Sequence, residues 1–390
     1  MYAAAEPLRV GMLVGSTIQS HGVIEIVRSL ASALEKRGNI AVEIFSLEHE
    51  DGESVDLGAI PIHVAPTLGP RSFRFAPDLV NMMHQRNLDC VHVHGMWNYL
   101  SVAARRWHQM ARRPYIVSPH GMIDRWALAN TTIRKRVVRM LFEDAHIRDA
   151  AVVHAVSATE HESVRQAGYA TPTDVIPNGV EPAEMAGPAA PWLEALGPDA
   201  RVLLFLGKIT PSRGLASLLR AWHLAADAEG GEGWHLVIVG PSSPDHLAEL
   251  RALTTELGIA QTVHFVGPAF GSDRGAAYRS ADAFVLPSLS ETLPMTALEA
   301  FAFELPSLLT PQCNIPEAFA RGAAIRVEPN EESLAKGLAR LFAMTPMDRS
   351  RMGRAAYDLA DSRYDWDLAA SRFESLYATV LAQSRGIQAA

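Results

Sequence analysis

Residues 286–300 read LPSLSETLPMTALEA, in which a strand-like run ends and a helix is expected to begin at Pro294. Proline suits the first helical position, because its missing N–H would have no partner there and its ring already holds a helical φ. Leu293 would then be the N-cap, and it offers no side-chain oxygen to the N–H groups of Met295 and Thr296. Such a helix start, with free amides and a partial positive charge, favours phosphate binding.

Two carboxylates flank this helix start, Glu291 just before it and Glu299 about one and a half turns inside it. Acidic residues are common near the start of ordinary helices. The stretch alone therefore leaves a structural and a functional interpretation open.

Length and composition indicate a globular protein of two domains, because 390 residues exceed what one core usually serves. The net charge of -8 argues against a nucleic-acid partner. Cys90 and Cys313 lie far apart without disulfide or metal spacing, as expected in a reducing cytoplasm. Residues 1–7 lack the basic start of a secretory signal, and no apolar run reaches the roughly 20 residues that span a bilayer.

Short apolar runs alternate with helix-period segments, which is typical of an α/β fold with parallel sheets. We expect two doubly wound domains, residues 1–180 and 181–365, and a C-terminal helix within 366–390 that crosses back to the first domain. Ligands bind outside the carboxyl ends of such strands, so we expect the active site in the cleft between the domains. The expected strands are 8–14, 42–47, 60–64, 90–93, 115–117, 151–156, 202–206, 235–239, 263–266, 283–286 and 307–309, and the expected helices include 25–37, 79–87, 101–112 and 367–383.

A basic loop, residues 207–214 (GKITPSRG), follows the first strand of the second domain. Its glycines permit close backbone approach, and Lys208 and Arg213 can both point at one phosphate. The spacing is not that of a Walker loop, and alone the segment could be a solvated basic turn. Together with the uncapped helix it predicts a diphosphate pocket.

Histidines follow strands in the first domain. His120, in the segment SPHG, is expected to face the cleft, the alternative being a histidine bonded to loop backbone. His92 and His94 project to one face of a strand and could hold a metal, but no third ligand is apparent. The first strand-to-helix turn, residues 15–22, carries glycines without a dinucleotide fingerprint.

Several motifs occur together and in order. They are PNGV at 177–180, the 207–214 loop, VGP at 239–241, FVG at 265–267, AD at 281–282, LPS at 286–288 and the Glu291–Glu299 pair. With them the chain resembles, over nearly its whole length, the retaining glycosyltransferases of family 4, which have the two-domain GT-B fold.

The resemblance implies roles for single residues. Lys208 and Arg213 would bind the diphosphate, although the family usually has Arg first and Lys second. Glu299 would accept the ribose hydroxyls, Glu291 would meet the donor sugar, and His120 would touch that sugar near the reacting carbon. The other implied donor-binding positions are Gly22, Gly240, Pro294, Met295 and Thr296, and the acceptor-side candidates are His21, Glu25, His94 and Trp97.

The chain departs from the family pattern at three places. Thr292-Leu293-Pro294 stands where the family often has Gly-Phe-Gly, which removes one amide donor and leaves the identity of the sugar open. Glu304 replaces a frequent glycine, and Gln312-Cys313-Asn314 replaces a glycine pair.

The implied reaction moves a hexose from a UDP- or GDP-linked donor with retention, without a metal, a cofactor or an obligatory carboxylate nucleophile. Lys208, Arg213 and the two amides would stabilise the departing diphosphate. A two-carboxylate glycosidase is disfavoured, because the helix turns Glu299 away from the reacting carbon. Asp365-Trp366-Asp367 spells a metal motif of another transferase fold, but we expect it to cap the last helix.

The acceptor is expected on the first domain, where residues 101–139 hold nine basic residues against one acidic residue. Interleaved Trp107, Trp126, Ile133, Val137 and Val138 suggest a helix on anionic lipid, although a solvated basic face is the alternative. We therefore expect a lipid-linked or cell-envelope glycan acceptor and a cytoplasmic enzyme at the inner face of the plasma membrane. A sugar-nucleotide 2-epimerase and a non-catalytic sugar-nucleotide-binding protein remain alternatives.

Overall fold

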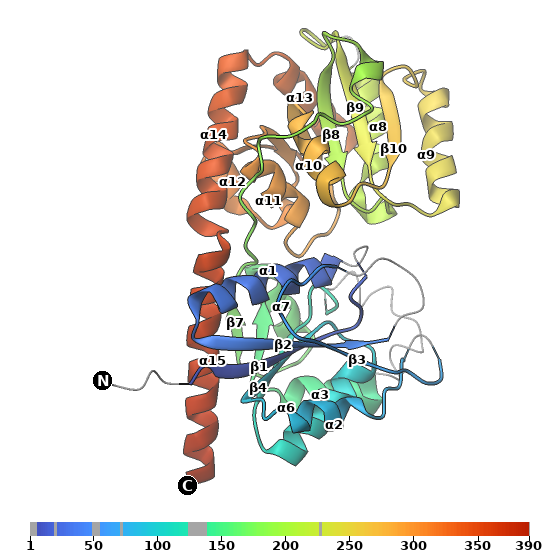
Figure 1. The fold of residues 1–390 in the computed structure, drawn as a ribbon. Coiled ribbons are helices and arrows are strands. Elements are labelled where there is room, and N and C mark those ends of the chain that lie inside the picture. The colour runs from blue at the N-terminus through green and yellow to red at the C-terminus, as the bar shows by residue number, and fades with distance from the viewer. Residues whose placement is uncertain are drawn as a thin grey trace. The chain divides into compact units, whose positions relative to one another are not determined.

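The computed structural model describes residues 6–18, 22–48, 55–70, 73–123, 139–225 and 228–389. The chain divides into two compact units. Unit 1 comprises Met1–Gly179 and Trp366–Ala390, and unit 2 comprises Val180–Asp365. Each unit contains one parallel sheet with helices packed on it (Figure 1).

The described residues of unit 1 form a seven-stranded parallel sheet in the order β3-β2-β1-β4-β5-β6-β7. The strands are β1 Leu8–Val14, β2 Ile40–Leu47, β3 Ile62–Ala65, β4 Cys90–His94, β5 Tyr115–Ser118, β6 Val152–Ala155 and β7 Thr173–Val175. The helices are α1 Gly22–Arg37, α2 Leu79–Gln85, α3 Tyr99–Ala111, α6 Asp144–Asp149, α7 Ala158–Gln166 and α15 Trp366–Ala389, and a π-helical turn, Arg139–Glu143, precedes α6.

The described residues of unit 2 form a six-stranded parallel sheet in the order β10-β9-β8-β11-β12-β13. The strands are β8 Arg201–Leu206, β9 Trp234–Val239, β10 Val263–Gly267, β11 Ala283–Leu286, β12 Ser307–Leu309 and β13 Ala324–Arg326. The helices are α8 Leu215–Leu224, α9 Pro244–Glu256, α10 Gly271–Arg279, α11 Met295–Ala302, α12 Pro316–Ala320, α13 Glu331–Phe342 and α14 Pro346–Arg363. The predicted α/β class and the two doubly wound sheets are therefore confirmed.

Helix α15 belongs to unit 1 because its apolar stripe packs there. Phe373, Tyr377 and Val380 recur at helical spacing and are buried in one core cluster with residues of α1 and β1. Where the chain leaves and re-enters unit 1, a Cβ on Gly179 would lie 2.6 Å from the Trp366 ring. Only glycine leaves room for the ring at this junction.

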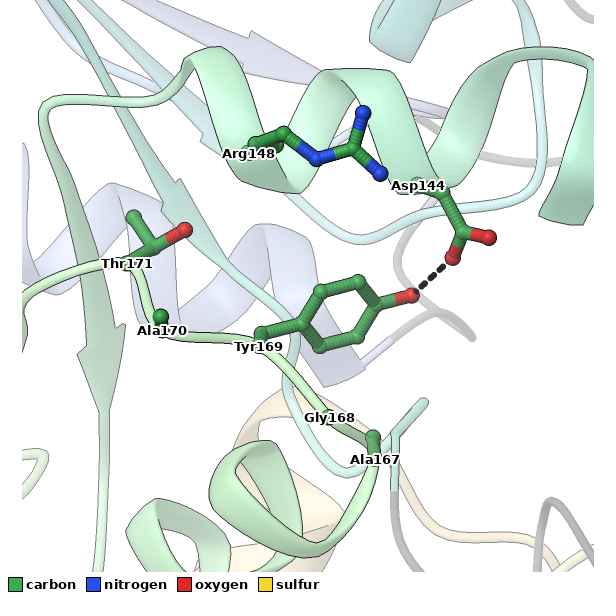
Figure 2. Close-up of a pocket in the computed structure, with 7 residues that line it drawn as sticks. All are labelled: Asp144, Arg148, Ala167, Gly168, Tyr169, Ala170 and Thr171. Carbon is green, nitrogen blue, oxygen red and sulfur yellow. Dashed lines mark hydrogen bonds between the residues drawn. The ribbon is translucent and has the colours of Figure 1, made fainter.

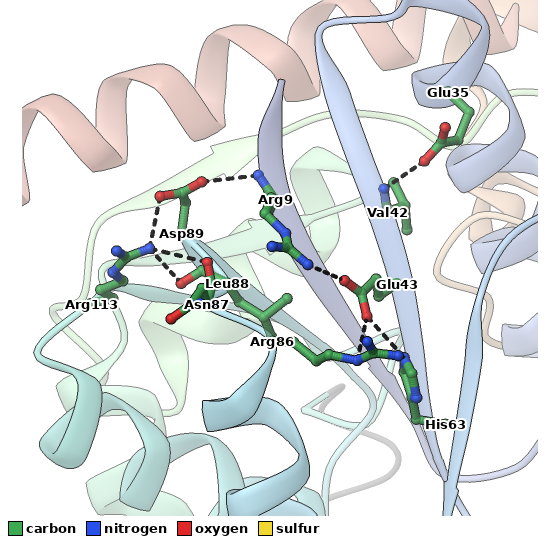
Figure 3. A network of polar contacts seen from close by, with 10 residues as sticks. All are labelled: Arg9, Glu35, Val42, Glu43, His63, Arg86, Asn87, Leu88, Asp89 and Arg113. Carbon is green, nitrogen blue, oxygen red and sulfur yellow. Dashed lines mark hydrogen bonds and ion pairs between the residues drawn. The ribbon is translucent and has the colours of Figure 1, made fainter. Parts of the chain in front are cut away.

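A polar network joins β1, β2 and β3 near the amino end of β1 (Figure 3). Glu43 pairs with Arg9 at 2.8 Å, His63 at 2.8 Å and Arg86 at 3.1 Å. Burial alone would raise the pKa of Glu43, but hydrogen bonds from Arg9 and His63 outweigh burial and hold the pKa below its ordinary value. This network lies away from the carboxyl ends of the strands and stabilises the sheet.

Candidate functional site

In unit 2 the predicted donor residues gather where the strand order reverses. Strands β8 and β11 are neighbours, and the chain runs outward in opposite directions from them. The loop after β8 holds residues 207–214, and the loop after β11 holds residues 287–294. In open α/β sheets this switch point is the usual ligand-binding place.

Close backbone contacts fix these two loops. Gly214 has φ +71°, and a Cβ there would lie 2.1 Å from the carbonyl oxygen of Pro287. The amide of Leu289 donates to the Ser212 carbonyl at 2.8 Å. Glycine is therefore required at position 214 for the loops to meet.

Gly240, which follows β9, supports the same edge. Its φ is +151°, and a Cβ would lie 1.8 Å from the Gly207 carbonyl oxygen. The Gly207 amide in turn donates to Val239 O at 3.0 Å. Gly240 thus shapes the basic loop, and a donor contact at this residue remains a prediction.

Arg213 and Glu291 meet across the two loops. Arg213 Nη1 forms an ion pair with Glu291 Oε1, and the side chains are 25% and 8% exposed. Ser288 Oγ donates to the same carboxylate oxygen at 2.7 Å. The predicted phosphate-binding cation and the predicted sugar-binding carboxylate are therefore brought together.

Unit 2 has further sources of positive charge besides Arg213, including the side chain of Lys208 and the free amides at the start of α11. Lys208 is exposed and has no ion-pair partner among the described residues. Pro294 is the N-cap of α11, with φ -77° and ψ 108°, so the prediction that Leu293 caps a helix beginning at Pro294 was wrong by one residue. Proline has no side-chain acceptor, and within the described part of the chain the amides of Met295 and Thr296 have no acceptor. The free amides that the sequence predicted are therefore present.

Glu299 is held from one side by α10. Arg274 Nε and the Tyr278 hydroxyl both donate to Glu299 Oε2, at 2.8 and 2.7 Å. The side chain of Glu299 is 23% exposed. Two fixed donors on one oxygen orient the carboxylate and leave Oε1 for another ligand.

At two of the three departures from the family pattern, the backbone conformation shows why glycine is frequent in the family. Glu304 and Asn314 have φ of +56° and +59°, in the left-handed region that favours glycine. Asn314 Nδ2 donates to the carbonyls of Glu291 and Thr292, and Glu304 pairs with Arg354 at 3.1 Å. Asn314 thereby ties the loop after β11 in place, which a glycine could not do.

In unit 1, four imidazoles cluster at the carboxyl ends of β4, β5 and β6. His94 Nδ1 lies 3.0 Å from His120 Nε2, and the rings of His92 and His94 are 4.1 Å apart. Burial lowers the pKa of His120 to about 3 and that of His154 to about 4, and it lowers the pKa values of His92 and His94 well below the ordinary range. All four rings are therefore neutral near pH 7.

His120 occupies a strained turn, because its φ is +50°. Glu160 supports the turn: its carboxylate accepts from the amides of Gly121 at 2.6 Å and Val156 at 2.8 Å. The His120 imidazole is hydrogen-bonded to His94, and among the described residues it has no bond to loop backbone.

The remaining predicted residues of unit 1 are scattered. Glu25 pairs with Arg28 on α1 at 3.0 Å, and Gly22 begins α1 with open space beside it. Trp97 has φ +73°, and its amide donates to Glu143 at 2.6 Å. His94 is only 2% exposed, so its side chain is not accessible to an acceptor as the prediction required. His21 lies outside the described residues.

The predicted lipid-binding segment is described only in part. Residues 124–138, with Trp126, Ile133, Val137, Val138 and four of the basic residues, lie outside the described residues. Trp107 is 1% exposed in the core, so its assignment to a membrane-facing surface was wrong. Arg105 and Arg113 pair with acidic residues of their own unit. No helix among the described residues is long and apolar enough to cross a bilayer.

Within the described ranges, no three His, Cys, Asp or Glu residues are grouped as metal ligands would be. A pocket of unit 1, between α6 and residues 167–171, contains none of the predicted site residues (Figure 2). There the Tyr169 hydroxyl donates to Asp144 at 2.7 Å, beside Arg148.

The sequence did not indicate several residues that hold the site. They are Arg274, Tyr278, Ser288, Asn314 and Glu160. The four-residue spacing of Arg274 and Tyr278 on one helix face was the available signal, but their partner Glu299 lies on another helix.

Family comparisons agree with this architecture. Residues 192–359 match the family of glycosyl transferases group 1, and residues 21–179 match the glycosyl transferase 4-like domain. Together these matches cover most of the chain, which therefore belongs to the group 1 glycosyl transferases. It is a glycosyltransferase of the GT-B type.

Individual proteins and structures resemble this chain over different shares of its length. An uncharacterized glycosyltransferase of Methanocaldococcus jannaschii is 26% identical over 372 residues, 90% of this chain and 92% of that protein. The D-inositol 3-phosphate glycosyltransferase of Streptomyces griseus is 35% identical over 195 residues, only 48% of this chain and 41% of that protein. The structure of Anabaena HepE in complex with UDP-glucose has a TM-score of 0.73 at 19% identity and covers 95% of this chain and all of that chain.

Proposed function

We propose that this chain is a retaining hexosyltransferase that uses a UDP- or GDP-linked sugar and requires neither a metal nor a cofactor. The observation that carries the proposal is the grouping of Lys208, Arg213 and the free amides of α11 at the switch point of unit 2. Such a grouping suits a nucleoside diphosphate, whose negative charge grows as the sugar departs. The complex of HepE with UDP-glucose supports this class of ligand.

In the proposed reaction the bond from the sugar C1 to the diphosphate oxygen breaks, and an acceptor oxygen bonds C1 on the same face. The acceptor proton passes to the leaving phosphate oxygen, so no protein carboxylate has to attack. Glu291 then orients the sugar, because its carboxylate is already engaged by Arg213 and Ser288. Glu299 is proposed to accept the ribose hydroxyls through Oε1, the oxygen that α10 leaves open.

Unit 2 is proposed as the nucleotide-sugar domain and unit 1 as the acceptor domain. His120 would contact the donor sugar, and Glu25, Trp97 and His21 would contribute to acceptor binding. We propose a glycan or lipid-linked acceptor of the cell envelope and attachment of a cytoplasmic enzyme to the inner face of the plasma membrane through residues 101–139. Flotation with anionic liposomes at low salt tests the attachment, and protein that stays at the bottom of the gradient argues against it.

Incubation of the protein with UDP- and GDP-linked hexoses, followed by proton NMR, tests the activity. We expect slow release of nucleoside diphosphate with a free sugar whose first-formed anomer matches the donor, with and without a chelator. Glu291→Gln should slow the release strongly, because the sugar is less well oriented, and Glu332→Gln, a change on an exposed helix face, should not. A new sugar nucleotide without released diphosphate would instead indicate an epimerase.

A further inference from the structure

A chain of hydrogen bonds behind the histidine cluster has a defined direction. The carbonyl of Ile176 can only accept, so His154 Nε2, 2.7 Å away, carries the proton of that neutral ring. His154 Nδ1 therefore accepts from Ser118 Oγ at 2.6 Å, and Ser118 Oγ accepts from His92 Nε2 at 2.6 Å. His92 Nδ1 then accepts from the Tyr377 hydroxyl at 2.8 Å. The Ile176 carbonyl thus determines which atom is the donor in every hydrogen bond of this series.

His94 and His120 lie beside this series of hydrogen bonds. The direction of the bond between them follows from a different observation. His94 Nδ1 faces His120 Nε2 at 3.0 Å, so one of these nitrogens carries hydrogen and the other accepts it. His94 Nε2 is buried and has no partner among the described residues. A hydrogen on that nitrogen would be a buried donor without an acceptor, which folded proteins rarely tolerate.

The hydrogen of His94 therefore belongs on Nδ1, where it is donated to His120 Nε2. Because burial also keeps the His120 ring neutral, its own hydrogen is then on Nδ1. No partner for His120 Nδ1 is present in the described part of the chain, and the residue is partly exposed. This nitrogen points away from His94 and is free to meet a ligand.

We propose that His94 is a positioning residue that holds His120 as the Nδ1–H tautomer, so that His120 presents a hydrogen-bond donor to an oxygen of the donor substrate. The second part rests on the proposed function, since the oxygen belongs to the sugar or phosphate of a nucleotide sugar. His120 in this state neither accepts a substrate hydroxyl proton nor acts as an acid. His94 acts through His120 and does not itself touch the substrate.

Long-range proton–nitrogen NMR of the full chain, labelled with nitrogen-15 histidine, tests the tautomer without any substrate. Signals of His120 are assigned by their loss in His120→Asn. The expected spectrum has protonated Nδ1 and bare Nε2 at His120. His94→Asn, whose amide can replace the Nδ1–H donor, should keep this state, and His94→Phe, which has no donor, should shift His120 toward the Nε2–H form. His146→Phe is the control, because it changes a buried ring stacked on Tyr115 that is not hydrogen-bonded to the cluster.

Substrate binding adds a second readout. His94→Phe should weaken the binding of the nucleotide sugar about tenfold, which corresponds to the loss of one hydrogen bond. His94→Asn should retain most of the affinity. In a His120→Phe background, His94→Phe should cause no further loss of affinity. Protonated Nε2 at His120 in the unmodified protein overturns the inference, whether or not His94→Phe folds. Protonated Nδ1 without any binding of nucleotide sugars supports the tautomer and rejects only the proposed function.

Discussion

Arg213, on the loop after β8, forms an ion pair with Glu291, on the loop after β11, and Ser288 donates a second hydrogen bond to the same carboxylate oxygen. The pair links the two neighbouring strands at which the sheet of unit 2 reverses its order. We expect a bound diphosphate to contact the same guanidinium, which has further N–H donors besides those of the Nη1 that faces Glu291.

Arg213→Met should reduce both stability and donor affinity. Glu291, whose side chain is 8% exposed, would lose its cation, and we expect a loss of roughly 2 kcal/mol in the free energy of unfolding, discounted because Arg213 is partly exposed. Donor affinity should fall about a hundredfold with the loss of a charge-assisted contact. Urea denaturation and calorimetric titration measure the two effects.

The double variant Arg213→Met/Glu291→Gln separates them. Neutralising the orphaned carboxylate should recover more than half of the lost stability but none of the donor affinity. Equal losses of stability in the single and double variants would show that the loss does not come from leaving the Glu291 carboxylate without its cation.

Tyr278→Phe should weaken nucleotide binding by about five- to tenfold, because Glu299 loses one of two donors to Oε2 and its carboxylate is less well oriented. The turnover number at saturating donor should change little, since the ribose is remote from the reacting carbon. Tyr357→Phe, on the unrelated helix α14, is the matched control. Unchanged affinity in Tyr278→Phe would argue against a ribose-binding role for Glu299.

The parts of the site that depend on local chain order were predictable from the sequence. Loop 207–214 and the free amides of α11 follow from glycines, proline and the ends of apolar runs. The helix start was misplaced by one residue, because proline fits both the first helical position and the position before it. Strands β7 and β13, of three residues each, were missed because neither forms an apolar run: β7 contains Asp174 and β13 ends at the exposed Arg326.

The contacts that depend on tertiary packing were not predictable. Arg274 and Tyr278 reach Glu299 from another helix, and Trp107 looked like a membrane residue because its sequence neighbours are basic. His94 was predicted to meet an acceptor, whereas the fold buries it against His120. Sequence spacing gives the side of an element on which a residue lies but not what covers that side.

Asn314→Ala should destabilise the protein more than Asn314→Gly. Both variants lose the bonds from Nδ2 to the Glu291 and Thr292 carbonyls, but only alanine also opposes the left-handed φ of +59°. We expect losses of about 2 kcal/mol for alanine and about 1 kcal/mol for glycine, measured by urea denaturation. A glycine variant less stable than the alanine variant would contradict the backbone argument.

Glu143 should make stability depend on pH. Burial raises its pKa to about 7, although Ser101 and the Trp97 amide donate to it, while the unfolded value is 4.5. The folded state therefore keeps a proton that the unfolded chain releases, so this group's contribution falls as pH rises from about 4.5 to 7 and is constant above that window.

Comparison with Glu143→Gln isolates the effect, because the buried histidines contribute equally to both proteins. The stability of the unmodified protein relative to the variant should fall by roughly 3 kcal/mol across that window. A difference that stays constant from pH 4.5 to 8 would show that Glu143 is ionised throughout.

The most direct test of the central claim is thermal unfolding with a panel of UDP- and GDP-linked hexoses, for the unmodified protein, Lys208→Ala and the control Lys336→Ala, an exposed lysine on α13. At 100 times its dissociation constant, one of these donors should stabilise the unmodified protein and the control by roughly 2.7 kcal/mol. The same concentration should stabilise Lys208→Ala markedly less. Equal stabilisation of all three proteins, or no stabilisation by any nucleotide sugar, would contradict a donor site at the switch point of unit 2.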